Sequence, residues 1–220
     1  MTPTTIQVDE QHTVSALFQT PANPFACTIL AHGAGAGMNH PFMAAIAEGL
    51  LKREIATLRF QFPYMENGKK RPDRPDLAHK TIRAAVETAQ RLTTAKLFAG
   101  GKSFGARMTS QAQALSPLPG VKGLIFLGFP LHPAKKPSTD RATHLSEIAI
   151  PMLFLQGDRD TLADLNLLRP IVKKILDAKL NIVPYADHSF HVPVSSGKTD
   201  AQILNELLDT TASWMHDPDA

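Results

Sequence analysis

The chain has 220 residues, of which 43% are hydrophobic and 20% are charged, and its formal net charge is +3. A chain of this length buries about 70–75% of its unfolded surface on folding, so it needs neither a disulfide nor a metal to hold a core. No apolar run approaches the ~20 residues of a membrane span, the first residues lack the pattern of a signal peptide, and the scattered basic residues argue against a nucleic-acid site.

The only cysteine is Cys27, so no internal disulfide is possible. It lies in the apolar run 27–31, which predicts a buried strand residue. A single unpaired cysteine is compatible with a reducing compartment. We therefore expect a cytoplasmic protein with no membrane contact.

Apolar β-rich runs alternate with Gly or Pro turns and helical periods along the whole sequence. This alternation predicts one α/β domain over residues 1–220, with helices on both faces of a mostly parallel sheet and an antiparallel edge at its N-terminal end. The predicted strands are 4–9, 13–21, 27–32, 55–62, 96–100, 121–129, 151–156 and 179–184. The predicted helices are 41–53, 75–93, 104–115, 162–176 (interrupted or bent at Pro170) and 199–214.

Three long connections remain outside these elements. Residues 33–37 form a Gly-rich loop, and residues 65–74 are polar and rich in Pro. The segment 130–149 is predicted to be irregular. There is little room for a cap domain, so only 64–74 and 130–149 are candidates for a lid.

The motif Gly101-Lys102-Ser103-Phe104-Gly105 carries the first chemical signal. Gly-x-Ser-x-Gly between an apolar strand and a helix marks a sharp turn, in which the serine is strained and its hydroxyl stands clear of the sheet. The flanking glycines remove Cβ atoms that would clash there. The motif predicts Ser103 as a nucleophile; the alternative is a Gly-rich turn without chemistry. Lys102 is expected to point away from the pocket.

A serine hydroxyl needs a base to remove its proton. In this type of fold the acid and the base follow the nucleophile in that order. His188, just beyond the last predicted strand, is the best base among the nine histidines. Two acids follow the strand 151–156; Asp160 is favoured because its turn is one residue longer, and Asp158 is expected to cap a turn or a helix.

Two neighbours of His188 have other predicted roles. Asp187 is adjacent in sequence, so its side chain is expected to fix the loop rather than to face the imidazole. His191 could suggest a metal pair with His188, but no cysteine or carboxylate cluster with ligand spacing accompanies them. The sequence therefore predicts no metal site.

Acyl transfer places negative charge on a carbonyl oxygen, which backbone N–H groups stabilise. The amide of Phe104, after the nucleophile, is one predicted donor, and Ala34 in the loop 33–37 is the other. His32 is expected to anchor this loop by hydrogen bonds. The loop lacks the spacing of a dinucleotide site and the Lys-Ser/Thr of a P-loop, so no nucleotide cofactor is expected.

Taken together, these segments resemble the α/β-hydrolase superfamily over nearly the whole chain. The closer resemblance is to a compact group of hydrolase-like proteins that includes bacterial members, a testis-expressed animal protein and a subunit of the nonspecific lethal chromatin complex. Dienelactone hydrolases are more distantly similar, with Cys where this chain has Ser103. The motifs that carry the resemblance are 32–38 with 40–43, 101–107, 128–133, 156–160 and 187–189.

The resemblance implies an α/β-hydrolase fold without a cap and a Ser103–His188–Asp160 triad. The expected activity is a serine hydrolase of carboxylesterase type that cleaves a small acyl ester or thioester without a cofactor. Because some members of the group act as scaffolds, a non-catalytic binding protein is the alternative. The loop 130–137 either lines the pocket or is a rigid crossover, and Arg107 and Lys135 are candidates to meet an anionic substrate. The sequence leaves the oligomeric state undetermined.

Overall fold

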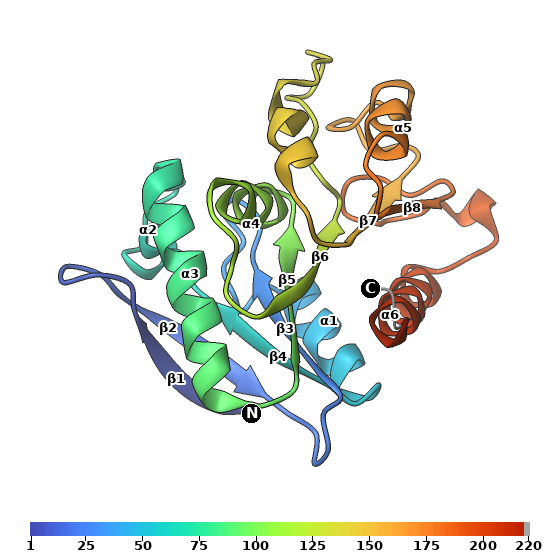
Figure 1. Cartoon of the computed structure of the whole chain (residues 1–220). Coiled ribbons are helices and arrows are strands. Elements are labelled where there is room, and N and C mark those ends of the chain that lie inside the picture. Colours follow the sequence, from blue (N-terminus) through green and yellow to red (C-terminus); the bar gives the residue numbers. More distant parts are fainter. Residues whose placement is uncertain (218–220) are drawn as a thin grey trace.

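The computed structural model describes residues 1–217, which form an eight-stranded sheet in the order β1-β2-β4-β3-β5-β6-β7-β8. The six neighbouring strands β4, β3, β5, β6, β7 and β8 are all parallel to one another, whereas β2 is antiparallel to both β1 and β4. The predicted architecture, a mostly parallel sheet with an antiparallel N-terminal edge, is therefore confirmed. The β1–β2 hairpin lies at one end of the sheet and β8 at the other (Figure 1).

The strands and helices alternate after the hairpin. The strands are β1 (Thr2–Gln7), β2 (Thr13–Gln19), β3 (Ala26–Ala31), β4 (Ile55–Phe60), β5 (Lys96–Lys102), β6 (Val121–Leu127), β7 (Met152–Gly157) and β8 (Ala178–Val183). The helices are α1 (Pro41–Leu51), α2 (Pro63–Glu66), α3 (Pro75–Leu92), α4 (Phe104–Leu115), α5 (Leu165–Lys173) and α6 (Asp200–His216), with short 3₁₀ helices at Asp140–Glu147 and Val194–Ser196.

Helices cover both faces of the sheet, so the core has two layers (Figure 1). One layer joins α1 and α6 to the sheet through residues such as Ile46 and Leu207. The other joins α3, α4 and α5 through residues such as Ile82, Met108 and Leu168. Strands covered on both faces are continuous apolar runs, and β3 and β7 are buried along their whole length.

The structure differs from the sequence prediction in two connections and one helix. The segment after β4 contains the short helix α2, which begins at Pro63, where the missing N–H of proline has no cost. The helix predicted over 162–176 is shorter, because Asp164 caps it by accepting from the N–H of Asn166. It contains Pro170 and ends at Lys173. The irregular segment 130–149 contains a 3₁₀ helix at Asp140–Glu147.

The segment 130–149 packs into the molecule. Leu131 and Leu145 are fully buried, and the Oγ of Ser110 on α4 lies 2.7 Å from Nε2 of His144. His132 bridges two backbone groups, with Nδ1 2.9 Å from the carbonyl of Pro133 and Nε2 accepting from the N–H of Asp164. These contacts make the segment part of the framework, and no part of the described chain forms a separate cap.

None of the helices in residues 1–217 combines the length and the apolar character needed to cross a membrane.

Candidate active site

The turn after β5 has the strained geometry that its sequence predicts. Ser103 has φ +52° and ψ −112°, outside the regions that L-residues favour. A Cβ on either Gly101 or Gly105 would overlap the carbonyl group of Ala31, and one on Gly100 would overlap that of Ile125. The neighbouring strands therefore approach this turn so closely that only glycine fits two residues before and two residues after Ser103. The N–H of Ser103 donates to the carbonyl of Leu127.

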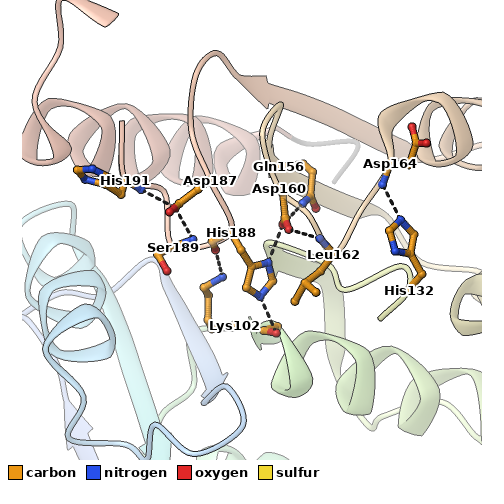
Figure 2. A network of polar contacts seen from close by, with 11 residues as sticks. Lys102, His132, Gln156, Asp160, Leu162, Asp164, Asp187, His188, Ser189 and His191 are labelled. Atoms are coloured by element: carbon orange, nitrogen blue, oxygen red, sulfur yellow. Dashed lines mark hydrogen bonds and ion pairs between the residues drawn. The ribbon is translucent and has the colours of Figure 1, made fainter. Parts of the chain in front are cut away.

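Three side chains that lie far apart in the sequence meet at the carboxyl ends of the strands. His188 Nε2 is 2.8 Å from Ser103 Oγ, and His188 Nδ1 is 2.6 Å from Asp160 Oδ2. Ser103 follows β5, Asp160 follows β7 and His188 follows β8, so the parallel sheet brings the three loops together at the carboxyl ends of its strands. Figure 2 shows Asp160 and His188 facing each other there. The structure thus brings together all three residues that the sequence predicts as nucleophile, base and acid.

The carboxylate of Asp160 is fully buried and is held on both oxygens. Oδ1 accepts from the N–H of Leu162 at 2.8 Å, and Oδ2 accepts from Nε2 of Gln156 as well as from His188. The competing acid, Asp158, is exposed, and among the described residues its side chain forms no hydrogen bond, so it caps neither the turn nor α5. Its predicted capping role is filled by Asp164 instead.

The loop that carries His188 is held from both sides. Asp187 Oδ1 accepts from the N–H groups of Ser189 and His191, which confirms the expected loop-fixing role (Figure 2). A Cβ on Gly157 would overlap the carbonyls of Ala186 and Asp187, so the end of β7 packs directly on this loop. Tyr185 and Phe190 both have φ above +60°, an uncommon conformation for side chains of this size.

His32, at the end of β3, anchors the Gly-rich loop as predicted. It is fully buried, its Nε2 accepts from the N–H of Phe62 at 3.1 Å, and its Nδ1 is 2.8 Å from the carbonyl of Gly33. Burial lowers the pKa of His32 to about 4. The ring is therefore neutral, with its proton on Nδ1, and it joins the loop to the segment after β4.

Residues on and after β4 also hold this loop, although no sequence motif predicted them. The hydroxyl of Tyr64 accepts from the N–H of Gly35 at 3.0 Å. The backbone of Met38 is held on both sides, because its N–H donates to Gln61 Oε1 and its carbonyl accepts from Nη1 of the buried Arg59. No local motif marks these residues, since their role depends on the β3–β4 pairing.

The predicted oxyanion donors lie on two sides of Ser103. Phe104 is the first residue of α4, where a backbone N–H has no partner within the helix. Ala34 follows Gly33, on which a Cβ would lie 3.8 Å from Ser103 Cβ, so the loop runs beside the serine. Within residues 1–217 the N–H of Ala34 has no hydrogen-bond partner.

A cavity of about 390 Å³ opens above Ser103. None of its lining residues in the described chain belongs to 64–74 or to 130–149, so the loop 130–137 is a crossover and not part of the wall. Arg107 and Lys135 do not line it either. Lys102 does, which corrects the expectation that this side chain points away. The lining residues are Gly33, Ala34, Ala36, His40, Phe42, Met43, Lys102, Ser103, Leu162, His188 and Ser189.

A second serine–histidine contact, between Ser110 and His144, lies outside this cavity. Ser110 is fully buried on α4, and its hydroxyl also donates to the carbonyl of Arg107. Burial and the nearby Arg107 lower the pKa of His144 to about 4. In the described part of the chain His144 has no carboxylate partner, so this pair joins α4 to the 3₁₀ helix and lacks the third member of a triad.

Comparison with known families identifies the family of the chain. Residues 24–216 match the model of an alpha/beta hydrolase domain. The chain belongs to the α/β-hydrolase family. The matched span includes the strained turn at Ser103 and the loops that carry Asp160 and His188.

Solved α/β hydrolases share the fold over the full length. A dienelactone hydrolase from Anabaena variabilis is 20% identical with a TM-score of 0.76, covering 98% of this chain and 96% of its own. A lidless α/β serine hydrolase from Xanthomonas campestris is 22% identical with a TM-score of 0.74, covering 97% and 94%. Est1E from Butyrivibrio proteoclasticus, solved with ferulic acid bound, is 17% identical with a TM-score of 0.72, covering 95% and 99%. At these identities the likeness establishes the fold alone.

Across residues 1–217, no three His, Cys, Asp or Glu side chains form a group that could hold a metal ion. His191 instead pairs with Asp200, with Nδ1 2.8 Å from Oδ2, and this hydrogen bond raises the pKa of His191.

Proposed function

We propose that this α/β hydrolase is a serine hydrolase that cleaves a small acyl ester or thioester through Ser103, His188 and Asp160. The observation that carries the proposal is the continuous hydrogen-bonded chain from Asp160 Oδ2 through His188 to Ser103 Oγ at the wall of a cavity. Such a chain supplies the base that an alcohol nucleophile needs and holds that base in one tautomer.

In the proposed reaction, Asp160 accepts from Nδ1–H of His188, which leaves Nε2 free to take the proton of Ser103. The serine oxygen bonds to the substrate carbonyl carbon, and the N–H groups of Ala34 and Phe104 stabilise the resulting oxyanion. His188 then protonates the leaving alcohol or thiol as the carbonyl re-forms. Water releases the acyl group by the same steps, with His188 again as base, and no cofactor takes part.

The cavity supports a small substrate. A volume of about 390 Å³ lies near the lower end of the ~300–1,000 Å³ range for ligand sites. Phe42, Met43 and Leu162 supply an apolar wall beside Ser103, which suits an acyl or aryl group better than a strongly polar one.

A fluorophosphonate probe tests the proposal, because it labels only an activated serine. We expect the native protein and the Ser110→Ala control to be labelled, and Ser103→Ala to remain unlabelled. Turnover of short p-nitrophenyl esters should follow the same pattern. Native protein that resists the probe, or equal labelling of Ser103→Ala, contradicts the proposal.

The same experiment separates the enzyme from a hydrolase-fold scaffold. A scaffold has no need of an aligned triad, so stable capture of a partner together with absent labelling and absent turnover would favour that alternative. We further propose that residues 1–220 form a single domain, supported by two core layers on one sheet. A cytoplasmic location is proposed on the free thiol of Cys27.

A further inference from the structure

Lys102 is the last residue of β5 and lies next to the strained Ser103. It immediately precedes Ser103, and its side chain lines the cavity, where it is the only lysine or arginine among the described lining residues. Its Nζ donates a hydrogen bond to the backbone carbonyl of His188. His188 is therefore held by two contacts, one between its imidazole and Ser103 and one between its carbonyl and Lys102, the residue before the serine. Figure 2 shows the contact between Lys102 and His188.

The surroundings of Nζ enclose it. It lies over the rings of Phe42 and Phe190, 5.9 Å and 5.3 Å from their centroids, and these two rings stack with an interplanar angle of 10°. On another side is Gly128, where a Cβ would lie only 2.8 Å from Nζ. The ammonium group therefore contacts two aromatic rings and one backbone carbonyl, while the lysine as a whole is partly buried.

The charged ammonium group of Lys102 destabilises the folded protein at this position. Burial lowers the pKa of Lys102 to about 8, and the charges of Asp160 and Asp187 offset only part of that effect. A methionine of similar shape would avoid the desolvation cost. A residue that lowers the stability of the fold and contacts the loop of His188 is expected where function requires it.

The contact that Lys102 makes is with the part of the loop that needs support. Tyr185 and Phe190, on either side of His188, both have positive φ, so the loop is held in a strained form by its contacts. Asp187 fixes the loop from within, whereas Lys102 ties the carbonyl of His188 to the end of β5. The imidazole and its backbone are thereby held relative to Ser103.

We propose that Lys102 is a positioning residue, whose ammonium group holds the backbone of His188 so that the imidazole stays aligned with Ser103. This inference rests on the proposed triad. It differs from a substrate-binding role, because the ammonium group donates to the backbone carbonyl of His188.

The test compares Lys102→Met with the matched control Lys122→Met, an exposed lysine on β6. A small misplacement of a catalytic group costs up to about 100-fold, so we expect kcat of Lys102→Met on neutral p-nitrophenyl acetate to fall by roughly 10–100-fold. KM should stay within about twofold, and Tm should be unchanged or higher, because a buried charge is removed. Lys122→Met should match the native protein in all three.

Chemical rescue covers the case in which Lys102→Met fails to fold. In Lys102→Cys, the thiolate displaces bromide from 2-bromoethylamine, which forms a C–S bond and restores a lysine-like ammonium. Cys27 should not compete, because it is fully buried and burial raises its pKa to about 12. We expect kcat to recover on aminoethylation and not on alkylation with 1-bromopropane, which gives the same shape without the charge.

Native kcat in Lys102→Met overturns the inference, and a raised KM alongside it would indicate substrate binding. Equal recovery with both alkylating reagents also overturns it. If the native protein is not labelled by the fluorophosphonate, the proposed function fails separately. The Nδ1–H proton resonance of His188 still tests Lys102 in that case, since it should broaden or shift in Lys102→Met and stay unchanged in Lys122→Met.

Discussion

Gln156 donates its side-chain amide to the oxygen of Asp160 that also faces His188. Oδ2 of Asp160 thus accepts from Gln156 Nε2 and from His188 Nδ1, while Oδ1 accepts from the backbone of Leu162. Gln156 is the second-to-last residue of β7 and is fully buried. Because a strand side chain holds the carboxylate, its orientation is set by the sheet rather than by the loop alone.

This arrangement predicts different effects for the two neighbouring acids. Asp160→Asn keeps the shape but offers an amide to His188 Nδ1, which favours the wrong tautomer, so kcat should fall by about 10⁴-fold. Asp158→Asn, the exposed control, should keep native kcat. Steady-state kinetics on a short p-nitrophenyl ester measures both. Loss of activity in Asp158→Asn with retention in Asp160→Asn would reverse the assignment.

The hydroxyl of Tyr64 is expected to support the Gly-rich loop 33–37. Tyr64→Phe removes the acceptor of the Gly35 N–H, and a hydrogen bond of about 0.5–1.5 kcal/mol corresponds to a decrease in kcat of roughly 2–10-fold if the loop is aligned only in its presence. The chain has one other tyrosine, the partly exposed Tyr185, and Tyr185→Phe is the matched control. Equal kcat for the two variants would show that the loop keeps its geometry without Tyr64.

A substitution at Gly128 separates the effect of backbone strain from the effect of a steric contact with Lys102 and His188. Gly128 has φ +69° and Gly197 has φ +73°, so alanine at either position should cost about 1–2 kcal/mol of stability. A Cβ on Gly128 would press on Lys102 Nζ and lie 3.5 Å from His188 Cε1, whereas one on Gly197 meets nothing within 4 Å. We expect both variants to show a lower free energy of unfolding in urea, but only Gly128→Ala to lose kcat.

Because burial lowers the pKa values of His32 and His144, we predict that the free energy of unfolding falls in mild acid. The pKa of His32 is lowered to about 4, so the unfolded chain binds a proton between about pH 6.5 and 4 that the native state does not. The stabilising contribution is complete above pH 6.5 and is lost as the pH falls toward 4, by roughly 3 kcal/mol for His32. His144 acts in the same direction.

Urea unfolding at fixed pH values from 7.5 to 4 measures this loss. The free energy of unfolding should be nearly constant down to about pH 6.5 and decrease below it. His32→Asn should start from a lower stability and show a smaller decrease over the same range. A native protein whose stability is constant down to pH 4 would contradict the prediction.

The order of the elements and most of their bounds could be predicted because they depend on local patterns. Apolar runs, proline at first helical turns and glycine at tight approaches act within a few residues, so β3 to β8 and the strained Ser103 were expected. The short helix α2 and the 3₁₀ helix at Asp140–Glu147 lie in Pro-rich or polar stretches with weak periodicity, and there tertiary packing decided the structure.

The same division holds for the site. The sequence alone determined that a strained serine follows one strand, that an acid and a histidine follow later strands, and that a Gly-rich loop precedes them. Only the tertiary structure decided what surrounds them: Gln156 on the carboxylate, Tyr64 on the loop and Lys102 beneath His188. The contacts of Tyr64 with Gly35 and of Lys102 with His188 join segments at or after the ends of different strands, so they depend on strand order and register, which no local pattern encodes. Gln156 and Asp160 are only four residues apart, and their contact depends on the turn after β7.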